Sequence, residues 1–184
     1  MLYTFYPTSS TKTTARSGGT TSELFIFPEE SEFKSGDYKL RLSIATVEVE
    51  ESTFTSLPDV NRTLMVLNGQ LKLSHEGHHE TVLNPLEKDK FLGDWNTKSW
   101  GKVTDFNLMT KGDCSGILNG YELSQKQTFS IKAKEQYTFI HNRKGSLKIG
   151  EINLSTGESV LIREANDIQI DIIEDSVIVI VEFS

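Results

Sequence analysis

Polar residues along one expected strand are spaced to bind a small molecule. Hydrophobic and polar residues alternate over 103–109, so Asp105 and Asn107 share one face while Phe106 and Leu108 share the other. A carboxylate accepts hydrogen bonds, and the amide of an asparagine both donates and accepts them. We therefore expect Asp105 and Asn107 to form one wall of a polar pocket.

Two arginines could bring positive charge to the same pocket. Arg41 and Ser43 share a face of the alternating segment 39–45, and Arg62 precedes an apolar run. A guanidinium binds a carboxylate through two parallel hydrogen bonds, which favours a small anionic ligand. The alternative is a structural ion pair between Arg62 and Asp105 that needs no ligand.

A histidine-rich turn offers a competing chemistry. Imidazole and carboxylate groups bind zinc, iron and nickel, and four such groups stand close together: His75, His78, His79 and Glu80. However, Gly77 predicts a tight turn at the tip of an exposed hairpin, and the adjacent His78 and His79 would point to opposite sides of a strand. We expect an exposed polar hairpin here, with a metalloenzyme as the alternative.

Other catalytic motifs are weak. Cys114 is the only cysteine and lies in a loop, and no recognisable motif places a histidine near it. The glycine-rich run 17–21 lacks the lysine of a phosphate-binding loop and opens no helix. We assign no catalytic residue from these segments.

Composition and charge narrow the class of protein. The chain has 184 residues and a formal net charge of −7 at pH 7, with no basic stripe of the kind that binds nucleic acid. A single cysteine excludes an internal disulfide, and no apolar run approaches the roughly 20 residues of a membrane-spanning helix. The first residues lack the basic and apolar regions of a signal peptide. We expect a soluble, cytoplasmic protein without nucleic-acid or membrane partners.

The elements that must position these side chains are strands. Apolar and polar residues alternate almost throughout, turn sequences such as Asn68-Gly69 recur at short intervals, and no stretch has helical periodicity. The apolar run 177–181 predicts a central strand covered on both faces. We expect an all-β chain, after an extended or poorly ordered lead-in of about fifteen residues. The expected strands are 22–27, 39–45, 63–67, 70–74, 103–109, 137–140, 146–154, 167–172 and 177–181.

Two parts of the chain share an internal similarity. An apolar run followed by Asn68-Gly69-Gln70-Leu71-Lys72 is similar to a later apolar run followed by Asn142 and then by Gly145-Ser146-Leu147-Lys148. A repeated β-meander suits this length better than one barrel. We therefore expect an N-terminal domain at 1–112 and a degenerate C-terminal copy at 113–184, packed as one globular body.

Five segments together resemble the HutD/Ves family. They are Arg16-Ser17-Gly18-Gly19-Thr20-Thr21-Ser22-Glu23, Arg41-Leu42-Ser43-Ile44-Ala45, Phe54-Thr55-Ser56-Leu57-Pro58 leading to Arg62, Leu67-Asn68-Gly69, and Asp105-Phe106-Asn107-Leu108-Met109. Beyond Gly112 the resemblance extends only to length and β-character. The chain departs from the family pattern at Asp59, Asn61 and Ala15, where the family usually has glycine, an acidic residue and tryptophan or a similar residue.

The resemblance implies a bacterial protein with a cupin-type fold and two jelly-roll-like β-barrels, a bicupin. It also implies a regulatory or accessory role in histidine utilisation, through binding of a small carboxylate such as formylglutamate. The expected ligand-binding residues are Arg62, Asp105, Asn107, Ser43 and Arg41, with Thr21 and Glu23 at the mouth of the pocket. Exposed strand edges further suggest a homodimer.

The cupin resemblance also argues against a metal in this pocket. Metal-binding cupins place a glutamate ligand seven residues before the glycine of their first motif, and counting back from Gly69 puts Arg62 there. A cation at that position opposes a divalent metal and favours an anion. We therefore predict a metal-free binding protein without a cofactor. The alternatives are a metal-dependent cupin isomerase or dioxygenase, and a protein-interaction module that uses strand edges.

Overall fold

Strands form nearly all the regular structure of the chain. The computed structural model describes residues 2–184, which contain nineteen β-strands, one short 3₁₀ helix (η1, Thr8–Ser10) and no α-helix. The contacts divide the chain into two units, Lys12–Cys114 and Ser115–Ser184, the latter together with residues 2–11. The all-β prediction is confirmed.

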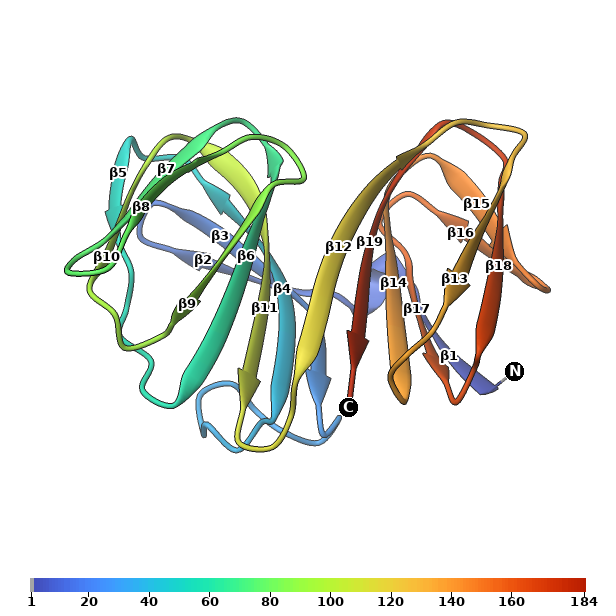
Figure 1. Ribbon diagram of the computed structural model, residues 1–184, viewed down its shortest axis with the longest axis horizontal. Helices are drawn as coiled ribbons and strands as arrows, with labels where there is room; N and C mark the ends of the chain where they lie inside the picture. The colour runs from blue at the N-terminus through green and yellow to red at the C-terminus, as the bar shows by residue number, and fades with distance from the viewer. Residues whose placement is uncertain (1) are drawn as a thin grey trace. The chain divides into compact units, whose positions relative to one another are not determined.

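The Lys12–Cys114 unit consists of two antiparallel sheets that face each other (Figure 1). The larger sheet has, in spatial order, β2 (Lys12–Arg16), β3 (Gly19–Phe27), β4 (Leu40–Val47), β11 (Val103–Lys111), β6 (Val60–Asn68) and β9 (Lys88–Leu92). The smaller sheet has β5 (Glu51–Thr53), β10 (Thr97–Trp100), β7 (Leu71–His75) and β8 (Glu80–Leu83). Between them lies an apolar core of Val47, Leu64, Val66, Leu71, Leu73, Leu83, Phe91 and Val103.

The Ser115–Ser184 unit also has two antiparallel sheets. One has, in spatial order, β1 (Leu2–Tyr6), β17 (Ser159–Arg163), β14 (Tyr137–Lys144), β19 (Ser176–Phe183) and β12 (Gly116–Leu123). The other has β13 (Thr128–Lys132), β18 (Asp167–Ile172), β15 (Ser146–Ile149) and β16 (Ile152–Ser155). Twelve buried aliphatic residues form its core: Ile140, Leu147, Ile149, Ile152, Leu154, Val160, Ile162, Ile168, Ile170, Ile172, Ile178 and Ile180.

The two units repeat one strand order. The arrangement β4-β11-β6-β9 recurs as β12-β19-β14-β17, and β5-β10-β7-β8 recurs as β13-β18-β15-β16. Gly69 and Gly145 follow equivalent strands, and both have φ of 90°. A Cβ atom there would lie 2.7 Å and 2.4 Å from a backbone carbonyl oxygen, so only glycine fits either turn. The internal similarity of the sequence therefore has a counterpart in the topology, and each unit keeps its strands in two separate sheets.

The structure sharpens or corrects several expectations about the elements. The first residues are extended, and not poorly ordered, because β1 pairs with β17 and β2 pairs with β3. For the same reason residues 2–11 group with Ser115–Ser184, whereas the sequence placed the whole of 1–112 in one domain. The expected strand 146–154 is two strands, since the chain reverses at Gly150 to pair β15 with β16.

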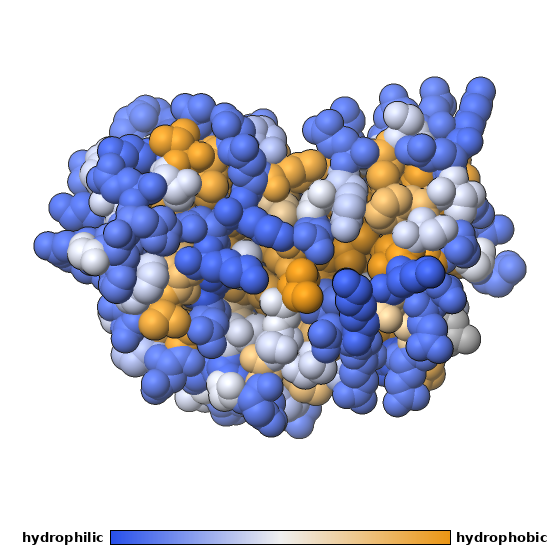
Figure 2. All heavy atoms as spheres, viewed as in Figure 1, coloured by the Kyte–Doolittle hydropathy of each residue, from blue (hydrophilic) through white to orange (hydrophobic). Residues whose placement is uncertain are grey.

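The surface of the Lys12–Cys114 unit is largely polar. The face that Figure 2 shows carries mainly hydrophilic side chains, with apolar residues in small separate areas. Val82 and Leu92 are among its exposed apolar residues. No helix in residues 2–184 is long and apolar enough to span a membrane.

Candidate functional site

The Lys12–Cys114 unit contains a cavity of about 590 Å³ that is partly open to solvent. Its walls come from β2, β3, β4, β5, β6 and β11, together with loop residues 31–34, Phe54, Thr55 and Leu57. The structure brings all seven residues of the expected ligand site to this lining: Thr21, Glu23, Arg41, Ser43, Arg62, Asp105 and Asn107.

Strand register explains why these side chains meet. Ser43 lies opposite both Glu23 on β3 and Asn107 on β11, and Asn107 lies opposite Leu64 on β6. Residues directly opposite each other in a ladder point to the same face. The alternation seen in the sequence therefore puts one row of polar residues on the inner face of the larger sheet.

Arg62 is the cavity cation with an unpaired donor. Its guanidinium lies over the rings of Phe54 and Phe91, 4.8 and 5.1 Å from their centroids. Its Nη2 donates to Oδ1 of Asn107 at 3.1 Å, while its buried Nε has no hydrogen-bond partner. Burial lowers the pKa of Arg62 to about 10, so the group stays charged at neutral pH. A buried charged donor without a partner has unused binding capacity.

Asp105 is only 3% exposed and has no cation in direct contact. Its Oδ1 accepts a hydrogen bond from Nδ2 of Asn107, and no ion pair within residues 2–184 includes it. Burial raises its pKa to about 6, against the opposing effects of the Asn107 amide and the Arg62 charge. The direct Arg62–Asp105 ion pair is therefore not formed, since Asn107 bridges the two groups.

Arg41 already has an anionic partner. Its Nε lies 2.7 Å from Oε2 of Glu23, and its guanidinium is 4.1 Å from the centroid of the Phe33 ring. Near the same side of the cavity, Nε of Arg16 donates to Oγ1 of Thr21 at 3.1 Å. Arg41 and Glu23 therefore shape the wall, and Arg62 is the stronger candidate for ligand contact.

Several lining residues could not be identified from sequence periodicity. The lining has five cations, Lys12, Arg16, Lys34, Arg41 and Arg62, and three carboxylates, Glu23, Glu32 and Asp105. Cations thus outnumber carboxylates here although the whole chain carries −7. Lys34, Glu32 and Phe33 come from an irregular loop, whose path no alternation predicts.

The donor set of the cavity does not fit a cupin-type metal centre. Among the described residues that line it there is no histidine and no cysteine. Arg62 occupies the position that the motif comparison assigned to a glutamate ligand, and its positive charge opposes a divalent cation.

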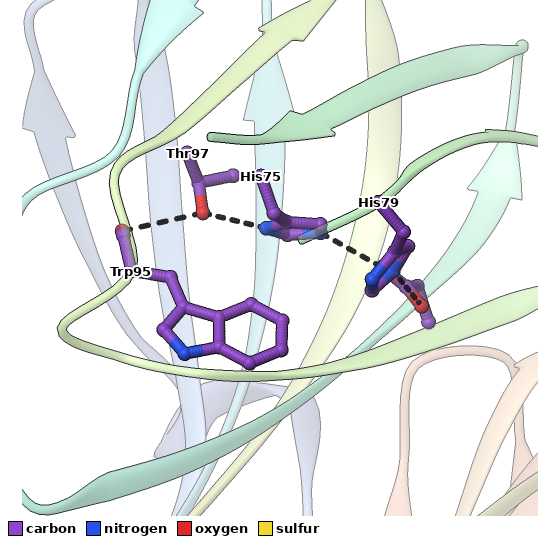
Figure 3. A network of polar contacts seen from close by, with 5 residues as sticks. His75, His79, Trp95 and Thr97 are labelled. Carbon is purple, nitrogen blue, oxygen red and sulfur yellow. Dashed lines mark hydrogen bonds and ion pairs between the residues drawn. The ribbon is translucent and has the colours of Figure 1, made fainter. Parts of the chain in front are cut away.

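A separate group of histidines lies elsewhere in the same unit, at the turn between β7 and β8 (Figure 3). His75 is 2% exposed, in contrast to the exposed hairpin that we expected, because its ring packs 4.5 Å from that of Phe91. His75 and His79 both contact the carboxylate of Asp89 on β9. His78 and Glu80 have other partners, since His78 stacks on Trp95 and Glu80 pairs with Lys72. Within residues 2–184, only His75, His79 and Asp89 form a group that could hold a metal ion.

Cys114 has no activating environment. It is buried, and its burial raises the pKa of the thiol, with Asp113 adding to the effect. A thiol with a raised pKa is a poor nucleophile. The structure therefore gives this cysteine no catalytic setting.

Sequence comparison identifies the family. A family model described as HutD matches residues 14–180. The chain belongs to the HutD family. No curated protein matches the sequence significantly.

Solved structures show that this HutD-family chain has a cupin-like fold. The conserved protein of unknown function PA5104 from Pseudomonas aeruginosa PAO1 has a TM-score of 0.82 at 16% identity, with 100% of both chains covered. HutD from Pseudomonas fluorescens SBW25 (formate condition) has a TM-score of 0.75 at 19% identity, again with 100% of both covered. The bacterial pirin YhhW from Escherichia coli in complex with nickel(II) has a TM-score of 0.76 at 12% identity, with 98% of both covered.

Proposed function

We propose that the Lys12–Cys114 unit binds a small anionic metabolite in its cavity without the help of a metal ion there, and that the chain is an accessory or regulatory protein. The observation that carries this proposal is the Arg62 guanidinium, which lines a cavity of about 590 Å³ and keeps a buried donor unpaired. Pockets of about 300–1,000 Å³ are typical of small-molecule sites.

The surroundings of Arg62 suit a carboxylate. Phe54 and Phe91 cover part of its guanidinium, so a carboxylate beside it would interact through a medium less polar than water. The hydrogen bond to Asn107 orients the Arg62 guanidinium. Ser43 lies opposite Asn107, and its hydroxyl can donate a hydrogen bond to a carboxylate ligand. Arg16 supplies a second positive charge in the lining, which favours a ligand with two carboxylates, such as formylglutamate.

We further propose that the chain acts in histidine utilisation, in the cytoplasm, and that its repeated topology is that of a bicupin with the ligand in the first of two barrels.

The competing function is that of a metal-dependent cupin enzyme. The pirin YhhW contains nickel(II), but at 12% identity this likeness concerns the fold. Such an enzyme needs ligands in the cavity, where this chain has Arg62, Arg41 and no histidine among the described lining residues. The donor set therefore favours anion binding.

Thermal unfolding with a panel of mono- and dicarboxylates tests the proposal. At a ligand concentration about 100 times the Kd, binding stabilises the folded state by about 2.7 kcal/mol. We expect at least one dicarboxylate to raise the Tm of the wild-type protein and to leave the Tm of Arg62→Ala unchanged. Arg143→Ala is the matched control, because it removes the same group from β14 of the Ser115–Ser184 unit.

Two results would contradict the proposal. One is that no carboxylate in the panel stabilises the wild type. The other is that Arg62→Ala responds to the ligand as strongly as Arg143→Ala does.

A further inference from the structure

We propose that His75, His79 and Asp89 form a binding site for a divalent transition-metal ion of the zinc class, separate from the cavity. Each residue offers one ligand atom, and the three atoms lie within 4.8 Å of one another. Two imidazoles and one carboxylate are a common ligand set for zinc, and three protein ligands leave one position open for water.

The two histidine–aspartate distances are close to those of a loaded site. Nε2 of His75 is 2.8 Å from Oδ2 of Asp89, and Nε2 of His79 is 3.0 Å from both carboxylate oxygens. With metal–nitrogen bonds of about 2.0–2.1 Å, the ligand atoms of a tetrahedral site are about 3.3 Å apart. Because the three ligand atoms lie within 4.8 Å of one another, binding an ion requires only small side-chain movements, and the partly exposed His79 can make them.

Thr97 orients His75 for this role. The Thr97 hydroxyl donates to the carbonyl oxygen of Trp95 at 3.3 Å, so its lone pair can accept from Nδ1–H of His75, 2.7 Å away (Figure 3). In that tautomer Nε2 of His75 has a lone pair that can bind an ion held by the Asp89 carboxylate. Without an ion, a proton on Nε2 makes the 2.8 Å contact with Asp89 a hydrogen bond, so a bound ion would take the place of that proton. A hydrogen bond from the other ring N–H of a ligand histidine, which fixes its tautomer and orientation, is a regular feature of metal sites.

The neighbours of the cluster give it rigidity. The His75 ring packs between Phe91, at 4.5 Å, and Trp95, at 5.5 Å between ring centroids. His75 belongs to the smaller sheet and Asp89 to the larger one, so a bound ion would link the two sheets of the unit. The Phe91 ring also lies 5.1 Å from the Arg62 guanidinium, so the ion would brace one wall beside the anion cavity without entering it.

Zinc titration by calorimetry on tag-free, chelator-treated protein tests the site. We expect one zinc ion per chain with a micromolar or lower Kd, and a higher Tm when zinc is present. His79→Ala should weaken binding at least about 10-fold, and Asp89→Asn should do the same. His78→Ala is the matched control, because His78 stacks on Trp95 outside the cluster and its loss should leave the zinc Kd nearly unchanged.

The alternative is a metal-free hydrogen-bonded cluster. It would be established if zinc gave no saturable heat up to millimolar concentration, or if His79→Ala bound zinc like the wild type. An equal loss in His78→Ala would also overturn the proposal, since it would indicate adventitious binding to surface histidines. His79 is partly exposed, so this test stands even if Asp89→Asn fails to fold. Arg62→Ala should keep full zinc binding, which separates this test from that of anion binding.

Discussion

The two units share a strand order but differ in the polarity of the residues on the inner face of one sheet. Equivalent residues of the two units can be matched from a β-bulge that both contain, between β11 and β6 in one unit and between β19 and β14 in the other. The first pair after the bulge is Asp105 with Val66 in one unit and Ile178 with Asn142 in the other, so Asp105 corresponds to Ile178. Two residues further along the strands, Asn107 corresponds to Ile180. One inner face thus carries a carboxylate and an amide where the other carries two isoleucines.

Equivalent positions on the neighbouring strands differ in the same way. Arg62 lies opposite Met109 on β11, and at the equivalent place in the other unit Thr138 lies opposite Glu182 on β19. The residue that corresponds to Arg62 is therefore the uncharged Thr138. Ile178 and Ile180 belong to a closed aliphatic core, whereas Asp105 and Asn107 line a cavity. A few side chains on β6 and β11 therefore decide whether the space between the two sheets includes a cavity with charged side chains or is filled by aliphatic ones.

The largest expected effect comes from placing one side chain in both environments. Ile178→Asn buries an unpaired amide in an aliphatic core and should lower the free energy of unfolding by about 3–5 kcal/mol. Asp105→Asn at the equivalent position should change it by less than about 1 kcal/mol when both are measured near pH 4, where the buried carboxyl is protonated and, like the amide, uncharged. Urea unfolding of both variants measures the difference. Equal costs would mean that the two interiors are not as different as the structure indicates.

The pH dependence of stability should have opposite signs in the two units. The pKa of Asp105 is raised from 3.8 to about 6, so between pH 4 and 6 the native state holds a proton that the unfolded state releases. The stability of the Lys12–Cys114 unit should fall by about 3 kcal/mol as the pH rises through this range. The pKa of His141 is lowered by burial from 6.5 to about 4, so the Ser115–Ser184 unit should lose about 3 kcal/mol as the pH falls from 6.5 to 4.

Separate probes can follow the two units. Both tryptophans, Trp95 and Trp100, lie in the Lys12–Cys114 unit, so their fluorescence reports its unfolding. Hydrogen exchange of the β14 amides reports the other unit. Asp105→Asn should remove the loss of stability of the Lys12–Cys114 unit between pH 4 and 6. His141→Gln should remove the loss of stability of the Ser115–Ser184 unit between pH 6.5 and 4. If either variant keeps the wild-type dependence of stability on pH, the substituted residue does not titrate as its burial implies.

The sequence predicted the inner polar row because period-2 alternation determines which residues share a face. Asp105 and Asn107 on β11, and Ser43 on β4, line the cavity as expected. The pairing of β1 with β17 could not be predicted, since it joins segments more than 150 residues apart whose local patterns do not specify a partner.

The histidine turn shows a second limit of sequence analysis. Local spacing predicted an exposed hairpin, but the burial of His75 depends on Phe91 and its polar partners include Asp89, both from a distant strand. Asp89 was therefore missed as a member of the cluster. The sequence did contain a clue to Asp89. It lies two residues before the buried Phe91 on an alternating strand, so both side chains are on one face.

We expect an anion to bind beside Arg62 in one unit and not in the interior of the other. A crystal soaked with 4-bromobenzoate, whose bromine gives an anomalous signal, tests this directly. There should be a bromine peak inside the cavity, with the carboxylate within hydrogen-bond distance of the Arg62 guanidinium, and no peak in the interior of the Ser115–Ser184 unit. An empty cavity under saturating ligand, or a carboxylate bound away from Arg62, would contradict it.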